Sequence, residues 1–125
     1  MTQTKAELNH VEMFEWLKAL DFYKNELKFW RKHLGEVVSR NSANHTLREA
    51  EHFQNQVIIQ EEHIDILRHD VKQFENHLES ELISGNSLSA LTIHVEGQLR
   101  DRLRTFEHIY VDLKHEYYSF LRKNM

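Results

Sequence analysis

The residues best suited to chemistry are ten histidines in a chain of 125 residues. Glu49 and His52 have the Glu-x-x-His spacing that binds paired metal ions in helical bundles. If the chain folds back near residue 42, His33 lies level with His52 and Glu36 level with Glu49. At 100° per residue, however, Glu36 points away from the apolar stripe and His52 lies at its edge. The four side chains do not converge, so we expect no metal site there.

The remaining histidines lie beside or opposite the apolar stripes. His108, Asp112 and His115 follow one helix face, which is opposite the stripe of its segment. An exposed trio of this kind can collect zinc adventitiously, and we expect a solvated face. A second group lies beside the stripe of the middle segment, where an imidazole suits a boundary position: His45, His52, His63 and His77. A pH-sensitive assembly is the functional alternative, because histidines at interfaces titrate close to neutrality.

Other reaction chemistry and several partner classes are disfavoured. The chain has no cysteine, so it has no thiolate nucleophile or thiolate metal site. It also has no Gly-x-Ser-x-Gly and no phosphate-binding loop. We therefore expect no enzyme and no cofactor. The net charge is −4, and Asp101 interrupts the densest basic stretch, Arg100 to Arg104, so we expect no nucleic acid partner. No apolar run approaches the ~20 residues of a membrane span, and the polar start suggests the cytoplasm.

Few turns interrupt the chain, which contains three glycines and no proline. Residues 41–44 and 84–87 are small and polar, and both segments have the length of helix–helix connections. They predict one domain over residues 1–125, with helices at about 5–40, 45–83 and 87–123. Thr4 and Thr46 begin possible capping boxes, and Asn86 or Ser87 can cap the third helix. Val37 and Val38 continue the pattern beyond Gly35, so we expect the first helix to pass through it.

Each predicted helix carries one apolar stripe with alternating spacings of three and four residues. The first contains Met13, Trp16, Leu20, Tyr23, Leu27, Trp30, Leu34 and Val37. The second contains Ala50, Phe53, Val57, Ile64, Leu67, Val71, Phe74, Leu78 and Leu82. The third contains Leu88, Leu91, Val95, Leu99, Phe106, Ile109, Leu113, Tyr117 and Phe120. Because short connections make neighbours antiparallel, the sequence predicts an all-α, up-down-up bundle of three long helices with coiled-coil-like packing.

The first predicted helix also contains both tryptophans of the chain, Trp16 and Trp30. In its length, its heptads and these tryptophans, the outline resembles a spectrin-type three-helix repeat. The resemblance implies the three-helix fold and no more.

One polar residue stands out beside the second stripe. Glu61 occupies a place where the heptad pattern favours an apolar residue, as Gln54 does one heptad earlier. Matching levels along the bundle puts Glu61 near Tyr23, Lys24 and Tyr110. A buried carboxylate needs a hydrogen-bond or ion-pair partner. We therefore expect Glu61 to be partly buried, to bond to one of these three side chains, and to fix the register of the helices. Proton handling is the functional alternative.

A second set of apolar residues lies outside the stripes. Phe22 and Phe29 are a heptad apart and roughly 130° from the first stripe, and Val11 shares their phase. Ile59 and Ile66 are likewise a heptad apart and roughly 120° from the second stripe. These residues either share one outer groove between the first two helices or turn toward the third helix and widen the core.

Exposed apolar patches usually mark an interface. We expect a non-enzymatic structural or protein-interaction bundle that binds itself as a homo-oligomer, or another helical protein, through Phe22, Phe29, Ile59 and Ile66. A bundle that binds a metal or a small ligand is the alternative.

Overall fold

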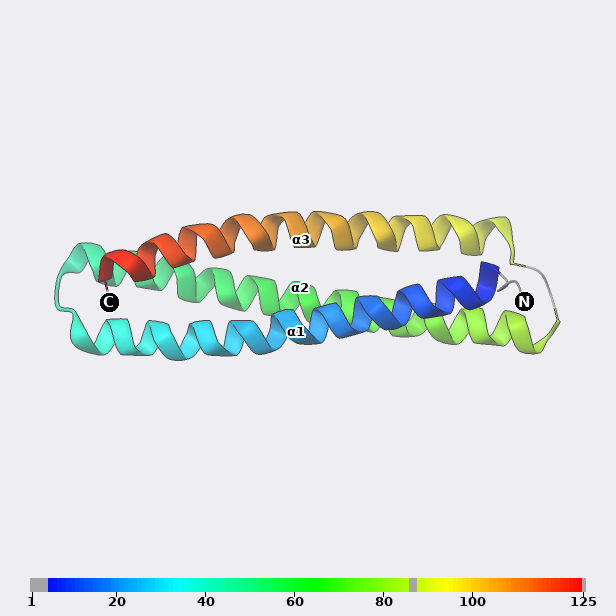
Figure 1. Cartoon of the computed structure of the whole chain (residues 1–125), viewed down its shortest axis with the longest axis horizontal. Helices are drawn as coiled ribbons and strands as arrows, with labels where there is room; N and C mark the ends of the chain where they lie inside the picture. Colours follow the sequence, from blue (N-terminus) through cyan, green and yellow to red (C-terminus); the bar gives the residue numbers. More distant parts are fainter. Residues whose placement is uncertain (1–4, 86–87, 125) are drawn as a thin grey trace.

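The computed structural model describes residues 5–85 and 88–124, and it describes side chains from Asn9 onward. Within this part of the chain, α1 (Lys5–Arg40), α2 (Asn44–Ile83) and α3 (Ala90–Asn124) form an antiparallel up-down-up bundle (Figure 1). The predicted fold class is therefore confirmed. α1 passes through Gly35 without a break, as expected.

The ends of the helices differ from the predicted capping boxes. α2 begins at Asn44 after Ala43, which makes no side-chain capping bond. Thr46 lies inside the helix, where its buried hydroxyl donates to Asn124 Oδ1 at 3.1 Å. For α3 the cap is Ser89, whose Oγ accepts from the Thr92 N–H at 3.1 Å. The other predicted caps, Thr4, Asn86 and Ser87, lie outside the described residues.

The first two apolar stripes form the core as predicted, except that Leu82 is exposed. The third prediction is wrong in places: Leu91 is 70% exposed and Ile109 is 45% exposed. The observed stripe of α3 contains Thr92, Glu96, Leu99, Leu103, Phe106, Tyr110, Leu113, Tyr117 and Phe120. This stripe keeps a strict alternation of four and three residues. Reading only apolar residues shifted the phase, because two of the buried positions are polar.

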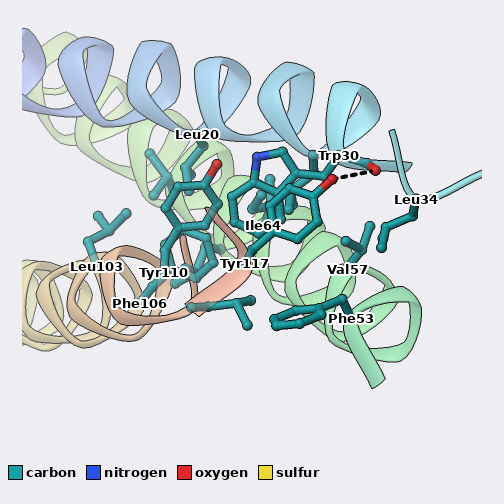
Figure 2. Close-up of a cluster of buried hydrophobic side chains, with 14 of the residues drawn as sticks. Leu20, Trp30, Leu34, Phe53, Val57, Ile64, Leu103, Phe106, Tyr110 and Tyr117 are labelled. Atoms are coloured by element: carbon teal, nitrogen blue, oxygen red, sulfur yellow. Dashed lines mark hydrogen bonds between the residues drawn. The ribbon is translucent and has the colours of Figure 1, made fainter. Parts of the chain in front are cut away.

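Aromatic side chains fill the space between α3 and the other two helices (Figure 2). Trp30 stacks on Tyr110 and on Tyr117, with ring centroids 5.4 and 4.5 Å apart. Phe53 of α2 lies against Tyr117 and Phe120 at 5.5 and 5.1 Å. Large rings increase the distance between helix axes. The backbones of α1 and α2 accordingly pack more closely together than either packs against α3.

Candidate functional site

The four predicted interface residues all lie outside the core. Phe22 is 59% exposed, Phe29 62%, Ile59 40% and Ile66 54%. The alternative that they widen the core is therefore wrong. They remain apolar side chains on a surface that is otherwise rich in charge.

The structure does not bring these four residues into one groove between α1 and α2. Ile66 lies one helical turn before Asp70, which accepts a hydrogen bond from Arg102 of α3, so Ile66 faces the α2–α3 side. Phe22 precedes Glu26 by four residues, and Phe29 follows it by three. The Glu26 carboxylate bonds to α3, so both phenylalanines lie toward the α1–α3 side. The phase of a residue gives its angle from the stripe but not which neighbour it turns toward. The two pairs therefore lie on different sides of the bundle.

The groove between α1 and α2 is instead bridged by charged side chains. Arg68 pairs with Asp21 at 2.9 Å and Lys24 with Asp65 at 2.6 Å. Arg31 pairs with Glu61 along the same groove. Ion pairs at these positions leave the space above the α1–α2 core covered by polar groups.

The side of α1 that faces away from the core carries an apolar row, which we call the outer face of α1. It contains Val11, Phe14, Phe22 and Phe29, all of them exposed. The spacings of 3, 8 and 7 residues keep them on one side of the helix. Lys18 lies among them, with its Nζ 5.6 Å from the centre of the Phe14 ring.

A groove between α2 and α3 contains two hollows. The larger hollow, of about 660 Å³, is lined by Asp70, Gln73, Phe74, His77, Leu91, Thr92, Val95, Gln98, Leu99, Asp101 and Arg102. The smaller hollow, of about 350 Å³, is lined by His63, Ile66, Leu67, Asp101, Arg102, Thr105, Phe106 and Ile109. We call them the Val95 hollow and the Ile109 hollow. Both are predominantly apolar, and Ile66 is the one residue of their lining that the sequence analysis predicted as an interface residue.

The Arg102–Asp70 ion pair crosses the groove where the two hollows meet. Arg102 Nη2 lies 2.8 Å from Asp70 Oδ2. The hydrogen bond from Arg102 lowers the pKa of Asp70 below its usual value, even though partial burial opposes the shift. The carboxylate is therefore charged at neutral pH, and the groove has one fixed polar bridge at its centre.

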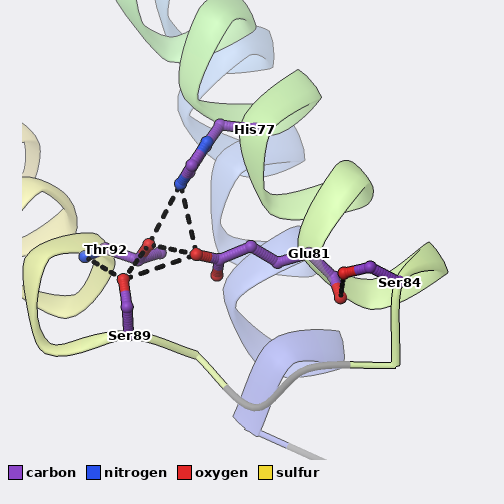
Figure 3. A network of polar contacts seen from close by, with 5 residues as sticks. All are labelled: His77, Glu81, Ser84, Ser89 and Thr92. Atoms are coloured by element: carbon purple, nitrogen blue, oxygen red, sulfur yellow. Dashed lines mark hydrogen bonds and ion pairs between the residues drawn. The ribbon is translucent and has the colours of Figure 1, made fainter.

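A polar cluster that the sequence reading missed closes the Val95 end of this groove (Figure 3). The Thr92 hydroxyl donates to Glu81 Oε1 at 2.9 Å, and it lies 2.8 Å from Ser89 Oγ. His77 Nε2 lies 3.1 Å from Thr92 Oγ1 and 3.3 Å from Glu81 Oε1. A catalytic relay needs one imidazole nitrogen on the hydroxyl and the other on the carboxylate. Here one nitrogen contacts both, and the cluster joins the end of α2 to the start of α3.

The histidines and carboxylates weighed as metal ligands remain apart. Among the described residues, no three His, Asp or Glu side chains gather closely enough to hold a metal ion. Glu49 Oε1 lies 2.5 Å from His45 Nε2, while the His52 ring packs edge-on against Phe53. On α3, His108 Nε2 lies 3.6 Å from Asp112 Oδ2 at the exposed surface.

The predicted partners of Glu61 are wrong, although its partial burial is confirmed. Its carboxylate accepts from Arg31, and Lys24 pairs with Asp65 instead. The residue within the stripe of α2 is its neighbour Gln60, which is buried, whereas Gln54 is exposed. The spacing from Val57 to Ile64 places the inward position three residues after Val57, one residue earlier than the sequence reading placed it.

Tyr110 does belong to a partly buried polar group, but its carboxylate is Glu26, and Tyr23 contacts this group only through its ring. The Tyr110 hydroxyl donates to Glu26 Oε1, and Lys114 Nζ donates to Oε2 at 3.0 Å. Burial and then Glu26 raise the pKa of Tyr110 above its usual value. Tyr23 packs against the Tyr110 ring with centroids 4.6 Å apart. Glu26 flanks the first stripe, and the level matching used for Glu61 did not consider it.

Comparisons with protein-family models, with curated proteins and with solved structures found no match to this chain. None of the helices in the described ranges is both long and apolar enough to cross a membrane.

Proposed function

We propose that this chain is a non-enzymatic interaction module that binds helical surfaces, and first of all those of its own copies. The observation that supports this proposal is the outer face of α1, where Phe14, Phe22 and Phe29 are all more than half exposed. These three phenylalanines follow one helix face, and the exposed Val11 lies in the same row.

Water contact makes such a row unfavourable for an isolated molecule. Burying apolar surface is worth about 25 cal/mol per Å², so covering large aromatic side chains supplies much of the free energy of association. Aromatic residues are also enriched at the centres of interfaces. An amphipathic partner surface would cover the row, as a groove covers the apolar face of a helix.

The test compares wild type with the double variant Phe22→Glu and Phe29→Glu by light scattering after size-exclusion chromatography. We expect wild type to form oligomers at micromolar concentrations and the variant to be a folded monomer. Ile58→Glu with Ile83→Glu is the matched control, because these exposed residues lie outside the outer face. A wild type that stays monomeric at high micromolar concentration contradicts the proposal.

A further inference from the structure

We infer that the outer face of α1 of one copy binds in the α2–α3 groove of a second copy, so that the molecules join head to tail. The inference rests on the proposed function and names the two surfaces that meet. Three features of the described residues support it: the placement of the surfaces, their spacing and their charges.

The two surfaces lie on opposite sides of one molecule. The residues that line both hollows come only from α2 and α3. α1 contributes no residue to either hollow, and its phenylalanines are exposed to solvent. A chain cannot fill its own groove with its own outer face. A contact between two different surfaces is heterologous, and it produces open chains or closed rings rather than a two-fold dimer.

The spacing of the phenylalanines matches the spacing of the hollows. Phe22 and Phe29 are seven residues apart, which is about 10 Å along a helix. On α3, the lining of the Val95 hollow runs from Leu91 to Arg102 and that of the Ile109 hollow from Asp101 to Ile109. The centres of these two stretches are between eight and nine residues apart, or roughly 13 Å. Each hollow, at about 660 and 350 Å³, has room for a phenyl ring.

The polar groups between the apolar ones also correspond. Asn25 lies between Phe22 and Phe29 on the outer face, and the Arg102–Asp70 pair lies between the two hollows. With one ring in each hollow, the Asn25 amide meets this ion pair and can bond to either partner. The match places a polar group opposite a polar group at the centre of the contact.

The lysines next to Phe22 and Phe29 are opposite in sign to the net charge of the groove. Lys18 and Lys32 are exposed on the outer face of α1, one turn before Phe22 and one turn after Phe29. The lining of the groove contains two carboxylates, Asp70 and Asp101, and one guanidinium, Arg102, so it has a net negative charge. Complementary charges of this kind select the orientation of a partner more than they add affinity. They favour this face of a second copy over an acidic helix.

Fewer lysine and arginine ion pairs bridge the α2–α3 groove than either of the other two grooves in the described part of the chain. Among the described residues, lysine and arginine ion pairs bridge α1 to α2 at three places and α1 to α3 at Glu12–Arg100 and Glu26–Lys114. Only Arg102–Asp70 is such a pair across the groove between α2 and α3. Its apolar lining is therefore accessible to an incoming helix.

The test uses two variants that each lose one surface. Phe22→Glu with Phe29→Glu removes the outer face, and Ile66→Lys with Leu91→Lys places one charge at each hollow. All four positions are exposed, so both proteins should keep the helicity of wild type in circular dichroism. Ile58→Lys with Ile83→Lys is the matched control for the second variant, because these exposed residues of α2 line neither hollow. If a charged variant loses helicity, alanine at the same positions makes the same comparison.

We expect each variant alone to be monomeric by sedimentation velocity, at concentrations where wild type and the control form species larger than a dimer. A 1:1 mixture of the two variants should restore a single contact and give a heterodimer and nothing larger. If the groove variant still assembles like wild type while the outer-face variant does not, the contact is two-fold or uses another surface, and the inference is wrong. If both are monomeric and the mixture stays monomeric, the groove does not accept α1. A monomeric wild type instead contradicts the proposed function itself.

Discussion

Glu26 joins α1 to α3 through two bonds of different character. Its carboxylate accepts from the buried Tyr110 hydroxyl and from Lys114, so each oxygen has its own donor. A carboxylate that loses one of its donors keeps the cost of dehydration without the compensating bond. The strength of this contact therefore depends on the phenol, which lies beneath the partly exposed lysine.

We predict that Tyr110→Phe lowers the free energy of unfolding by about 1–2 kcal/mol, because one oxygen of Glu26 then has no donor. Tyr118→Phe is the matched control, since it removes the hydroxyl of an exposed tyrosine on the same helix. Urea unfolding monitored by circular dichroism measures both. Equal midpoints for Tyr110→Phe and Tyr118→Phe would show that the Glu26 bond contributes nothing.

Gln60 is a buried amide within the apolar stripe of α2. Its side chain is 2% exposed, and its Oε1 has no hydrogen-bond partner among the described residues. A buried polar atom without a partner is costly, and one polar residue in a stripe can fix the register of neighbouring helices. Gln60, and not Glu61 as the sequence predicted, is therefore the polar residue within the apolar stripe of α2.

We predict that Gln60→Leu raises the free energy of unfolding by about 1–2 kcal/mol, because leucine has a similar volume and no polar group to dehydrate. Glu61→Leu, one residue further along, should change it by less than about 0.5 kcal/mol, since Glu61 bonds to a largely exposed arginine. Urea unfolding curves give both values. A destabilised Gln60→Leu would show that the amide has a partner that matters more than its dehydration.

Glu96 should make stability fall as the pH rises above the pKa of an unfolded glutamate. Burial raises the pKa of Glu96, although Arg100 donates a hydrogen bond to it. The folded chain then keeps a proton that the unfolded chain loses at about pH 4.3. Between that pH and the raised pKa, folding becomes less favourable as the pH increases. Glu96→Gln has no such proton, so its stability relative to wild type should increase as the pH rises above about 4.3, as measured by urea midpoints.

Asp70→Asn is the control of opposite sign. Arg102 lowers the pKa of Asp70, so its contribution is complete above about pH 3.9, where an unfolded aspartate ionises. That contribution is lost as the pH falls through the lowered pKa. Relative to wild type, Asp70→Asn should therefore lose stability at pH 7 and regain it in acid. A stability difference between Glu96→Gln and wild type that does not change with pH would contradict the burial of a titrating carboxyl.

The helices themselves follow from local pattern. Two polar breaks separate the helices. Apolar residues at alternating spacings of three and four then define the buried faces of α1 and α2 closely, because each stripe is almost entirely apolar. In α3 the stripe contains the polar residues Thr92 and Glu96. A prediction from hydrophobicity assigns their apolar neighbours Leu91 and Val95 to the stripe instead. The bond of Thr92 to Glu81 and that of Glu96 to Arg100 make these polar residues tolerable in the core, and such partners come from tertiary structure.

Gly35 and Gly85 have opposite roles in these elements. Gly35 lies inside α1, and a Cβ built there meets nothing within 4 Å. Gly85 has φ of +75°, the left-handed conformation that follows a helix end and that disfavours other residues. We predict that Gly35→Ala raises the free energy of unfolding by about 0.5–1 kcal/mol and that Gly85→Ala lowers it by a similar amount. Thermal unfolding of both variants checks the pair; a less stable Gly35→Ala would indicate a required bend in α1.

Helical phase could predict that Phe22, Phe29, Ile59 and Ile66 leave the core, but not which groove each pair enters. Three antiparallel helices can be arranged in two hands, which exchange the neighbours on either side of every stripe. The hand is set by packing of the aromatic layer and by pairs such as Glu26–Tyr110. The α2–α3 groove depends on that arrangement, since its lining combines residues of α2 and α3 that are 14 to 46 positions apart in the chain.

A chain that binds its own copies should become more stable as its concentration rises, because association withdraws folded molecules from the unfolding equilibrium. A hundredfold increase is worth up to about 2.7 kcal/mol per engaged contact, or roughly 5–10 °C in Tm for a domain of this size. We therefore expect wild type to melt several degrees higher at about 500 micromolar than at about 5 micromolar. Thermal scans followed by circular dichroism measure the difference. Phe22→Glu with Phe29→Glu should melt at one temperature throughout, and so should Ile66→Lys with Leu91→Lys, whereas the Ile58→Lys with Ile83→Lys control should follow wild type. A 1:1 mixture of the first two variants should recover part of the concentration dependence, because each copy then has one usable surface. If wild type melts at the same temperature across this range, the exposed phenylalanines of α1 do not drive self-association.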